Sequence, residues 1–283
     1  MTAATVALSP EPPGRLGRSA LAWAIKDSYV LTRRSLARIV REPETLMDVT
    51  VQPVIFVLLF SYVFGSAIRL PGGGNYHEYL IGGMLGMGLA GTAPGTAVGL
   101  VSDMSTGLID RFKSLPMSRA AVLAGRTVAD LLTQVIGLVV VCGVGLAIGW
   151  RVHSNAGDAL TALGLALFMG YAFTWAGACL GMVLRSPEAA QQLGFILFLP
   201  LTFISNAFVP TQGMPAWLAT VANWNPLSAL AAACRHLFGN PDPAAQIHAW
   251  PMQHPELAVV LWAVAIIAVF APLSVRLYRR KAL

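Results

Sequence analysis

The stretch ALTALGLALFMGYAFTWAGACLGMVL, Ala159 to Leu184, contains no Asp, Glu, Lys, Arg or His. A helix of about 20 residues can cross a hydrocarbon core of about 30 Å, so this stretch predicts a membrane-spanning helix. Runs of similar apolar character lie on either side of it along the chain. The six predicted spans are Val49 to Ile68, Tyr79 to Val101, Thr127 to Gly149, Ala159 to Leu184, Ala189 to Val209 and Leu257 to Val275.

The composition of the whole chain agrees with a membrane protein and excludes two other classes. Hydrophobic residues make up 56% of the 283 residues and charged residues 11%. Soluble domains are about 25% charged, which excludes a soluble enzyme. Disorder requires low hydrophobicity and high charge, which excludes a disordered chain. The net charge of +6 comes from basic residues placed between apolar runs, so it predicts contact with membrane lipid and no nucleic acid partner.

The basic residues lie mainly on one side of the predicted spans. With the N-terminus inside, every Lys and Arg except Arg69, Arg151 and Arg235 falls on the cytoplasmic side. Cytoplasmic loops carry the excess of Lys and Arg, so both termini are predicted to be cytoplasmic. Residues 1–18 lack the apolar core of a signal peptide and are predicted to be a retained, disordered tail. An even number of crossings leaves residues 210–256 as an extracellular re-entrant or interfacial helical hairpin before the last span.

The predicted spans lack the groups that drive ion-coupled transport or catalyse a reaction. Carriers and pumps place ionisable side chains in mid-membrane, whereas the acidic residues here lie near span ends. The sequence has no G-x-x-x-x-G-K-[ST] phosphate loop, H-E-x-x-H zinc pair or G-x-S-x-G elbow. Cys142, Cys179 and Cys234 have no metal-ligand spacing. We therefore expect no catalytic residue, metal or cofactor in this chain, and an energy source in a partner chain.

Residues 19–43 are predicted to form a cytoplasmic amphipathic interface helix before the first span. From Leu21 to Ile39 apolar residues recur every three or four positions, while basic residues that include Arg33 and Arg34 cover the other face. One interpretation is a membrane anchor attracted by anionic lipid. The other is a docking element for a cytosolic subunit, and the two roles can coexist.

The inner loop of residues 102–126 has more order than a simple link between two spans requires. A short helix from Leu108 to Leu115 would gather apolar side chains on one face, leave Asp110, Arg111 and Lys113 solvated, and end at Pro116. A solvated, positively charged loop is the plainer alternative. A compact helix with apolar and charged faces is better explained as a lever inserted into another protein.

Two motifs, one on each side of the predicted membrane, carry a family resemblance. The inner run contains Gly107, Leu108, Asp110, Arg111, Leu115, Pro116 and Arg119. The outer run contains Phe208, Pro210, Pro215, Trp217, Leu218, Asn225, Pro226, Leu227 and Arg235. Together, and in this order, they resemble the membrane subunit of ABC-2 type exporters, in particular drug-resistance permeases similar to the daunorubicin and doxorubicin efflux subunit of antibiotic-producing actinobacteria. Asp110 stands where Glu is commoner in the loop pattern of that family, a change that keeps the negative charge.

The resemblance implies an all-α integral membrane protein in a bacterial cell membrane, with residues 44–283 as a six-span ABC-2 type domain. It also implies a second permease chain, identical or paralogous, and two copies of a separate ATP-binding subunit that holds ATP and Mg²⁺. Residues 102–126 would act as the coupling loop. The residues expected to contact the ATP-binding subunit are Leu108, Asp110, Arg111, Phe112, Lys113, Pro116, Arg119, Arg33 and Arg34.

By analogy with the family, spans one, two and five would face the central path. The candidate substrate-lining residues are Phe56, Phe60, Met87, Phe195, Phe198, Phe203 and Asn206. Aromatic and Met side chains suit a flat apolar cargo. The resemblance therefore predicts outward export of a hydrophobic or amphipathic drug-like molecule.

Three other functions agree with parts of the sequence. A lipid or glycolipid exporter of the same family is the nearest alternative. A membrane-embedded enzyme acting on lipid would use an outer polar cluster, the best of which is His236 beside Arg235 and Asp242, although its spacing matches no known constellation. A structural or assembly protein would need no path for cargo, so cargo-stimulated ATP hydrolysis in the presence of the ATPase would exclude it.

Overall fold

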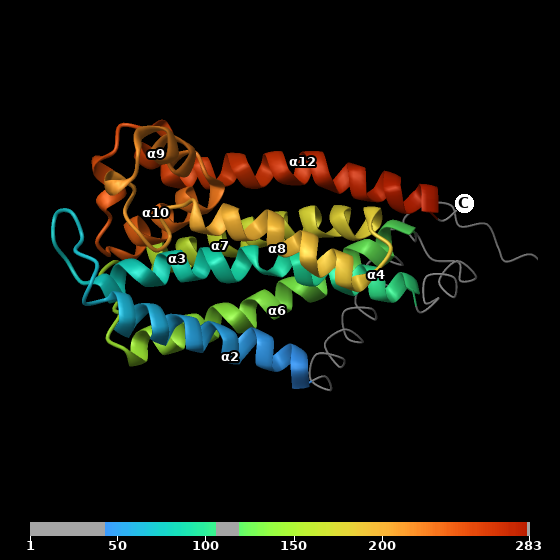
Figure 1. Cartoon of the computed structure of the whole chain (residues 1–283), viewed down its shortest axis with the longest axis horizontal. Coiled ribbons are helices and arrows are strands. Elements are labelled where there is room, and N and C mark those ends of the chain that lie inside the picture. Colours follow the sequence, from blue (N-terminus) through green and yellow to red (C-terminus); the bar gives the residue numbers. More distant parts are fainter. Residues whose placement is uncertain (1–42, 106–118, 282–283) are drawn as a thin grey trace, which may run out of the picture.

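Long helices run side by side along the molecule in the computed structural model, which describes residues 43–105 and 119–281 (Figure 1). Within these ranges there is no β-strand, so the all-helical prediction is confirmed for the described chain. The predicted tail, nearly all of the interface helix and residues 106–118 of the coupling loop lie outside it. The elements are α2 Pro43–Leu59, η1 Phe60–Phe64, α3 Tyr76–Ala90, α4 Thr92–Ser105, α6 Arg119–Ala147, α7 Ala156–Val183, α8 Pro187–Phe203, η2 Thr211–Gly213, α9 Ala216–Asn223, α10 Pro226–Phe238, η3 Pro243–Gln246, α11 Trp250–Gln253 and α12 Pro255–Lys281.

Four helical segments are long and apolar enough to cross a membrane, and they match predicted spans two, three, four and six. They are Tyr76–Ser105, Ala129–Ala147, Ala156–Val183 and Pro255–Tyr278. In place of the fifth predicted span, α8 has 17 residues, a length of about 26 Å against a hydrocarbon core of about 30 Å. In place of the first, α2 runs directly into the π-helix η1, and its apolar part, Thr50–Phe64, is also shorter. Six crossings therefore stay a prediction.

The helix ends follow from local side-chain chemistry. Asn75, Asn155 and Ser186 accept backbone N–H groups in the first turns of α3, α7 and α8. These caps satisfy donors that the helix itself leaves without a partner. At the other end of α10, Gly239 adopts a left-handed conformation with φ of 70°, which a residue without a Cβ adopts at little cost.

The predicted second span consists of two helices, α3 and α4, that meet at Gly91. Pro94 in the first turn of α4 has no N–H to donate, which favours a break at this place. Small residues then allow two other helices to approach α4 closely. A Cβ added to Gly181 of α7 would lie 2.8 Å from the Ala97 oxygen, and one added to Gly194 of α8 would lie 2.6 Å from Pro94 Cβ.

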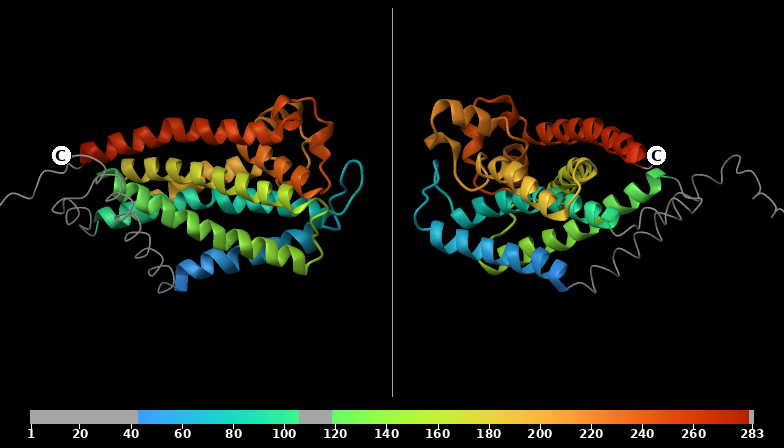
Figure 2. Two further views of the ribbon diagram at one scale, coloured as in Figure 1. Left: turned by 180° about the vertical axis from the view of Figure 1, so that it is seen from behind. Right: turned by 45° about the vertical axis from the view of Figure 1, so that its right-hand side comes forward.

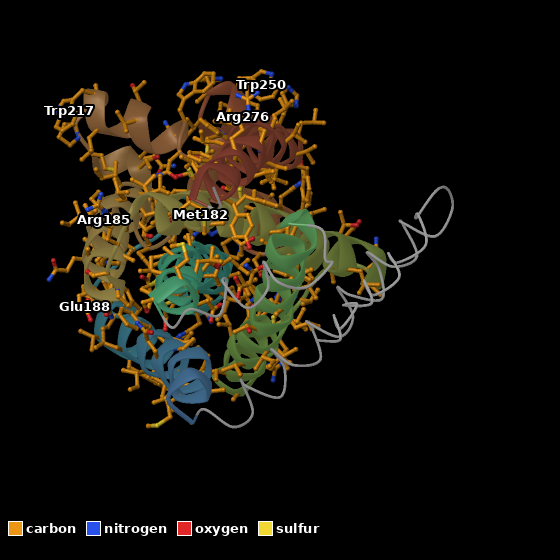
Figure 3. All side chains as sticks on the ribbon, turned by 90° about the vertical axis from the view of Figure 1, so that its right-hand side faces the viewer. Met182, Arg185, Glu188, Trp217, Trp250 and Arg276 are labelled. Carbon is orange, nitrogen blue, oxygen red and sulfur yellow. The ribbon has the colours of Figure 1, made fainter. Side chains whose placement is uncertain are left out.

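The bundle has two ends that contain different elements. The start of α2 and the ends of α4 and α12 lie at one end, which we name the inner end, and the loop between η1 and α3 lies with α9 and α10 at the opposite, outer end (Figures 1 and 2). Figure 3 looks along the bundle from the inner end, where Arg185 and Arg276 are found. The helix α2 lies beside α6, on the side of the bundle away from α12.

The segment predicted as a hairpin, residues 210–256, forms a helical cap at the outer end (Figure 1). Its helices α9 and α10 are separated at Trp224 and Asn225. Nearly all of α10 is buried, packed against α3, α7 and α12. By contrast, Trp217 of α9 points away from the bundle and is 71% exposed (Figure 3). Insertion of this cap into lipid stays a prediction.

Candidate functional site

A row of aromatic rings joins α2 and η1 to the end of α8. We name Phe56, Phe60, Phe64, Phe208 and Phe203 the aromatic row. The Phe60 ring stacks on Phe208 with 4.5 Å between centroids. The rings of Phe56 and Phe64 lie 6.1 and 5.0 Å from the Phe60 centroid. Phe203 continues the row, 5.8 Å from Phe208. Such pairs contribute about 0.5–1.5 kcal/mol each beyond the burial of their area, so the row is a cohesive aromatic cluster. Phe60 and Phe208 are buried in it, whereas Phe64 and Phe203 are exposed.

The π-helix η1 positions the central ring of this row. Phe60 is buried, whereas Tyr62, two residues later, is 67% exposed. A side-chain hydrogen bond between Ser61 Oγ and His77 Nδ1 ties η1 to the first turn of α3. Short π-helices occur frequently at functional sites, which makes this end of the first predicted span a candidate position for cargo contact.

The chain leaves α8 through a segment, residues 205–208, whose backbone is held by side chains from α3 and α10. We name it the bridge segment. The Tyr79 hydroxyl donates to the backbone oxygen of Asn206, and the Tyr76 hydroxyl donates to the backbone oxygen of Phe208 at 3.0 Å. The Asn206 N–H donates to Ser228 Oγ at 2.9 Å. Irregular backbone at membrane depth is tolerated where protein satisfies it, and these bonds do so.

Asn225 holds the last turn of α8 in the same way. Its side-chain N–H₂ group donates to the Leu201 and Ile204 oxygens, each at 2.6 Å. Its Oδ1 atom accepts the Leu227 N–H at 2.8 Å at the start of α10. One amide side chain therefore joins the end of one helix to the start of another.

Arg235 lies at the centre of these contacts and is completely buried. Its guanidinium donates to three backbone carbonyl oxygens, those of Tyr79 at 2.8 Å, Asn206 at 2.9 Å and Ala207 at 3.0 Å. Its Cζ atom lies 3.5 Å from the centroid of the Tyr79 ring, a cation–π contact. Burying a charge is costly unless hydrogen bonds and opposite partial charges compensate for it. Carbonyl dipoles and the tyrosine ring compensate here, and Arg235 fastens the bridge segment to α3 and α10.

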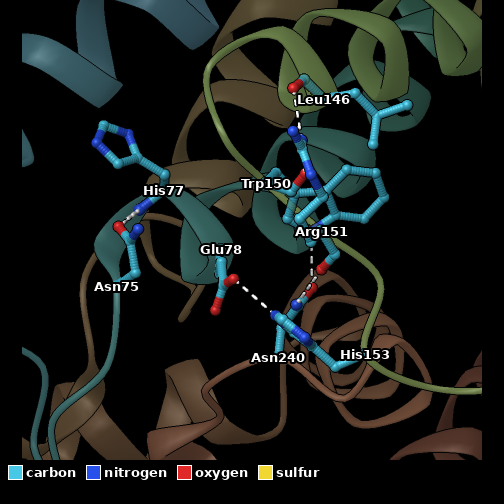
Figure 4. Close-up of polar contacts among 8 residues, drawn as sticks. All are labelled: Asn75, His77, Glu78, Leu146, Trp150, Arg151, His153 and Asn240. Carbon is cyan, nitrogen blue, oxygen red and sulfur yellow. Dashed lines mark hydrogen bonds and ion pairs between the residues drawn. The ribbon is translucent and has the colours of Figure 1, made fainter.

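A second set of polar contacts joins α3, the loop after α6 and the end of α10 (Figure 4). His153 Nε2 lies 2.8 Å from Glu78 Oε1. Trp150 donates to Asn240 Oδ1 at 2.7 Å, and Asn240 Nδ2 donates to the Arg151 oxygen at 2.8 Å. These contacts link three elements of the outer end that are distant in sequence.

The outer polar residues considered for lipid chemistry have separate partners. His236 Nδ1 lies 2.5 Å from Glu256 Oε1, whereas the Arg235 guanidinium donates to backbone oxygens. Asp242 caps η3, and burial raises the pKa of its carboxyl, which the nearby Arg235 charge offsets only in part. Over residues 43–105 and 119–281, no three His, Cys, Asp or Glu side chains gather as a metal site would require. The three residues thus have different hydrogen-bond partners, although the charges of Arg235 and His236 both act on Asp242, and a lipid-modifying enzyme stays an alternative.

At the inner side, two hydrogen bonds join α4 and α6, the helices that flank the predicted coupling loop. Thr96 Oγ1 donates to Asp130 Oδ2 at 2.7 Å, and Gln134 Nε2 donates to Thr92 Oγ1 at 3.0 Å. Arg119 is the first residue of α6. The other predicted contact residues lie outside the described ranges, so the coupling role stays a prediction for Leu108, Asp110, Arg111, Phe112, Lys113, Pro116, Arg33 and Arg34.

The predicted lining residues occupy three kinds of surroundings. Phe56, Phe60 and Phe203 belong to the aromatic row. On α8, Phe195 is exposed, and Phe198 packs edge-on against Phe173 of α7. Met87 is half-buried on α3, and Asn206 is 1% exposed within the Arg235 contacts. The lining role of all seven stays a prediction, and Asn206 has in addition a structural partner that its sequence position did not reveal.

The predicted lining set did not include several residues of the site, among them Phe64, Phe208, Tyr79 and Arg235. Phe208 carried a signal, because it begins the F-x-P part of the outer motif. Tyr79 carried none, since its hydroxyl meets a backbone oxygen 127 positions away. A contact of that sequence separation is set by helix packing and not by a local pattern.

Comparisons with known proteins agree with this architecture. A family model described as ABC-2 type transporter matches residues 27–238. The chain is 30% identical to the daunorubicin resistance ABC transporter permease protein DrrB1 of Streptomyces coeruleorubidus, over 93% of this chain and 90% of that protein. It is 26% identical to the doxorubicin resistance ABC transporter permease protein DrrB of Mycobacterium tuberculosis, over 87% and 86%. These matches confirm the predicted family resemblance: the chain belongs to the ABC-2 type transporter family of multi-pass membrane permeases.

Proposed function

We propose that this chain is the permease subunit of an ATP-driven exporter that moves a hydrophobic or amphipathic drug-like molecule outward across a bacterial cell membrane. The aromatic row carries the proposal, because the buried pair Phe60 and Phe208 holds the exposed rings of Phe64 and Phe203 in place, and exposed aromatic rings suit a planar apolar cargo. Two relatives are named as daunorubicin and doxorubicin resistance permeases, which supports the same class of cargo.

The proposed topology has six crossings and both termini in the cytoplasm. The start of α2 and the end of α12 lie at the same end of the bundle, which supports an even number of crossings (Figure 1). Arg185 and Arg276 lie at that end, where the excess of basic residues is expected to face the cytoplasm (Figure 3). The first and fifth crossings, α2 with η1 and α8, would be accommodated by local thinning of the bilayer. Residues 210–256 would form the extracellular hairpin.

The proposed assembly contains a second permease chain, identical or paralogous, and two copies of an ATP-binding subunit that binds ATP and Mg²⁺. The loop of residues 102–126 would contact this subunit from the cytoplasm, with the helix of residues 19–43 as a second contact. The bond between Thr96 and Asp130 supports a joint movement of α4 and α6, the two helices that such a loop would displace. Transport would follow from rigid-body switching between inward and outward access.

The proposal is tested in inverted vesicles that contain this chain and its cognate ATP-binding subunit. We expect ATP-dependent accumulation of daunorubicin that requires both chains and is lost when the partner cannot hydrolyse ATP. Phe60→Ala should raise the KM for daunorubicin, whereas Phe270→Ala, on α12 and outside the aromatic row, should not. Accumulation by this chain without the partner would refute the proposal, and ATP-driven transfer of a phospholipid in place of daunorubicin would identify a lipid exporter.

The coupling role requires its own experiment. Asp110→Ala and Phe112→Ala should abolish ATP-driven uptake while the amount of assembled complex, measured by co-purification, stays within about twofold of wild type. In a Lys113→Cys variant, the introduced thiol should react with an impermeant maleimide only from the cytoplasmic side. Labelling from the outside would overturn both the orientation and the coupling role.

A further inference from the structure

The bridge segment connects Arg235 to the aromatic row. Phe203 is the last residue of α8 and Phe208 the last of the bridge segment, so their rings flank it on both sides. Two of the oxygens that accept from Arg235 belong to Asn206 and Ala207, directly before Phe208. The place of the Phe208 backbone therefore depends on where the guanidinium holds these two carbonyls.

The buried position of Arg235 makes this restraint stiff. The side chain is held between the Tyr79 ring and backbone oxygens from two separate elements. A guanidinium presents planar, fixed donors, and Arg235 uses one of them on α3 and two on the bridge segment. Lys has a single donor group on a flexible stem, and Gln lacks the charge and the length. Neither can reproduce all three bonds.

We propose that Arg235 is a positioning residue that sets the Phe208 ring against Phe60 and so determines the affinity for a planar aromatic cargo. This inference rests on the proposed function, because it assigns the aromatic row as the place where cargo binds. Phe64 and Phe203 are the exposed rings of the row, and the buried pair Phe60 and Phe208 connects them. Arg235 itself is completely buried and does not touch the cargo. It acts through the Asn206 and Ala207 carbonyls on the row.

The test measures KM and maximal rate for ATP-driven daunorubicin uptake in inverted vesicles with the cognate ATP-binding subunit, corrected for assembled complex. Removing one stacked ring or its positioning residue should weaken cargo binding by about tenfold. We expect Phe208→Ala and Arg235→Gln each to raise KM by about that factor, with maximal rate within about twofold, and Arg235→Lys to give an intermediate value. The control is Arg151→Gln, since Arg151 also donates to carbonyl oxygens at the outer end but lies outside the bridge segment.

A double variant distinguishes a positioning role from a general loss of structure. If Arg235 acts through Phe208, the combination of Arg235→Gln and Phe208→Ala should have nearly the KM of Phe208→Ala alone, because the second change removes what the first displaces. If Arg235→Gln fails to assemble, Tyr79→Phe replaces it. This variant keeps the charge and removes only the hydroxyl donor to the Asn206 oxygen, and it should raise KM in the same direction.

Each outcome decides a different point. Failure of the wild-type complex to accumulate daunorubicin would overturn the proposed function together with this inference. Wild-type uptake in which Phe208→Ala raises KM but neither Arg235→Gln nor Tyr79→Phe does would overturn the inference and leave the proposed function intact. The inference would also fail if the KM effects of Arg235→Gln and Phe208→Ala multiplied independently in the double variant.

Discussion

The closest approach of α3 to the bridge segment occurs at Gly83, and Gly83→Ala should be the most damaging single-methyl change on this helix. An added Cβ would lie 2.5 Å from the Ala207 carbonyl carbon and 2.7 Å from its Cα, closer still to its oxygen. Ordinary contact begins at 3.4 Å, so the two backbones must separate by at least about 0.9 Å to clear the carbonyl carbon, the difference between 3.4 and 2.5 Å, and by more to clear the oxygen. The acceptor that would move is the Ala207 oxygen, which accepts from Arg235.

The cost follows from two destabilising terms and one stabilising term. Overpacking costs about 1–3 kcal/mol, and weakening a buried hydrogen bond to a charged group costs about 1.5–3 kcal/mol. The better helix propensity of Ala returns about 1 kcal/mol, leaving about 1.5–5 kcal/mol of destabilisation. At roughly 2–4 °C per kcal/mol, thermal unfolding of the purified chain in detergent should shift downward by roughly 3–20 °C.

Gly88→Ala is the matched control on the same helix. Gly88 is exposed, and a Cβ added there would meet nothing within 4 Å. This variant should therefore unfold at or slightly above the wild-type temperature, because only the helix propensity changes. Equal melting temperatures for Gly83→Ala and Gly88→Ala would refute the close packing of α3 on the bridge segment.

Three further changes test other contacts. Thr96→Val should cost about 1–3 kcal/mol, because it removes the hydroxyl of α4 that donates to Asp130 of α6. The control Thr133→Val should cost less than about 1 kcal/mol, because that hydroxyl donates within α6; equal denaturation midpoints of the two variants would contradict the prediction. Asn225→Ala should cost about 2–4 kcal/mol, since it removes a helix cap and two bonds to α8, and an unchanged melting temperature would exclude that role. Burial raises the pKa of Asp242, so the folded state binds more protons than the unfolded state and loses stability as pH rises from about 4 through the raised pKa. Asp242→Asn should therefore have the wild-type melting temperature below this pH window and a higher one above it. A variant that is less stable than wild type at neutral pH would contradict this prediction.

The spans could be predicted from sequence where the apolar run is itself the physical cause of the structure. Ala156–Val183 and Pro255–Lys281 include the predicted runs almost to the residue, because burial in lipid depends on local hydropathy. The fifth run was predicted to continue to Val209, but α8 ends at Phe203. Hydropathy gives only a weak sign of this end, since Ser205 and Asn206 are two polar residues inside an otherwise apolar run. The end depends on the side chains of α3 and α10 that bind the backbone of the bridge segment.

The aromatic row was predictable in part. The family analogy and aromatic character marked Phe56, Phe60 and Phe203, but the F-x-P motif that contains Phe208 did not indicate that its ring would join them. The ring of Phe208 meets Phe60 only because the chain turns back after α8, and that turn depends on partners from α3 and α10. The coupling residues differ in kind, because a pattern of charge and apolar spacing predicts their exposure but not their partner.

Arg235 shows how a charge count and a burial argument can disagree about one residue. Counting basic residues places it on the outside with Arg69 and Arg151, as if solvent or lipid headgroups received its charge. The structure buries it completely, with carbonyls of a non-helical segment as acceptors. Each feature makes the other tolerable, because an irregular segment in an apolar cap needs donors and a buried guanidinium needs acceptors. An arginine within an otherwise uncharged stretch is therefore best read together with the nearest interruption of a predicted span, here the end of α8.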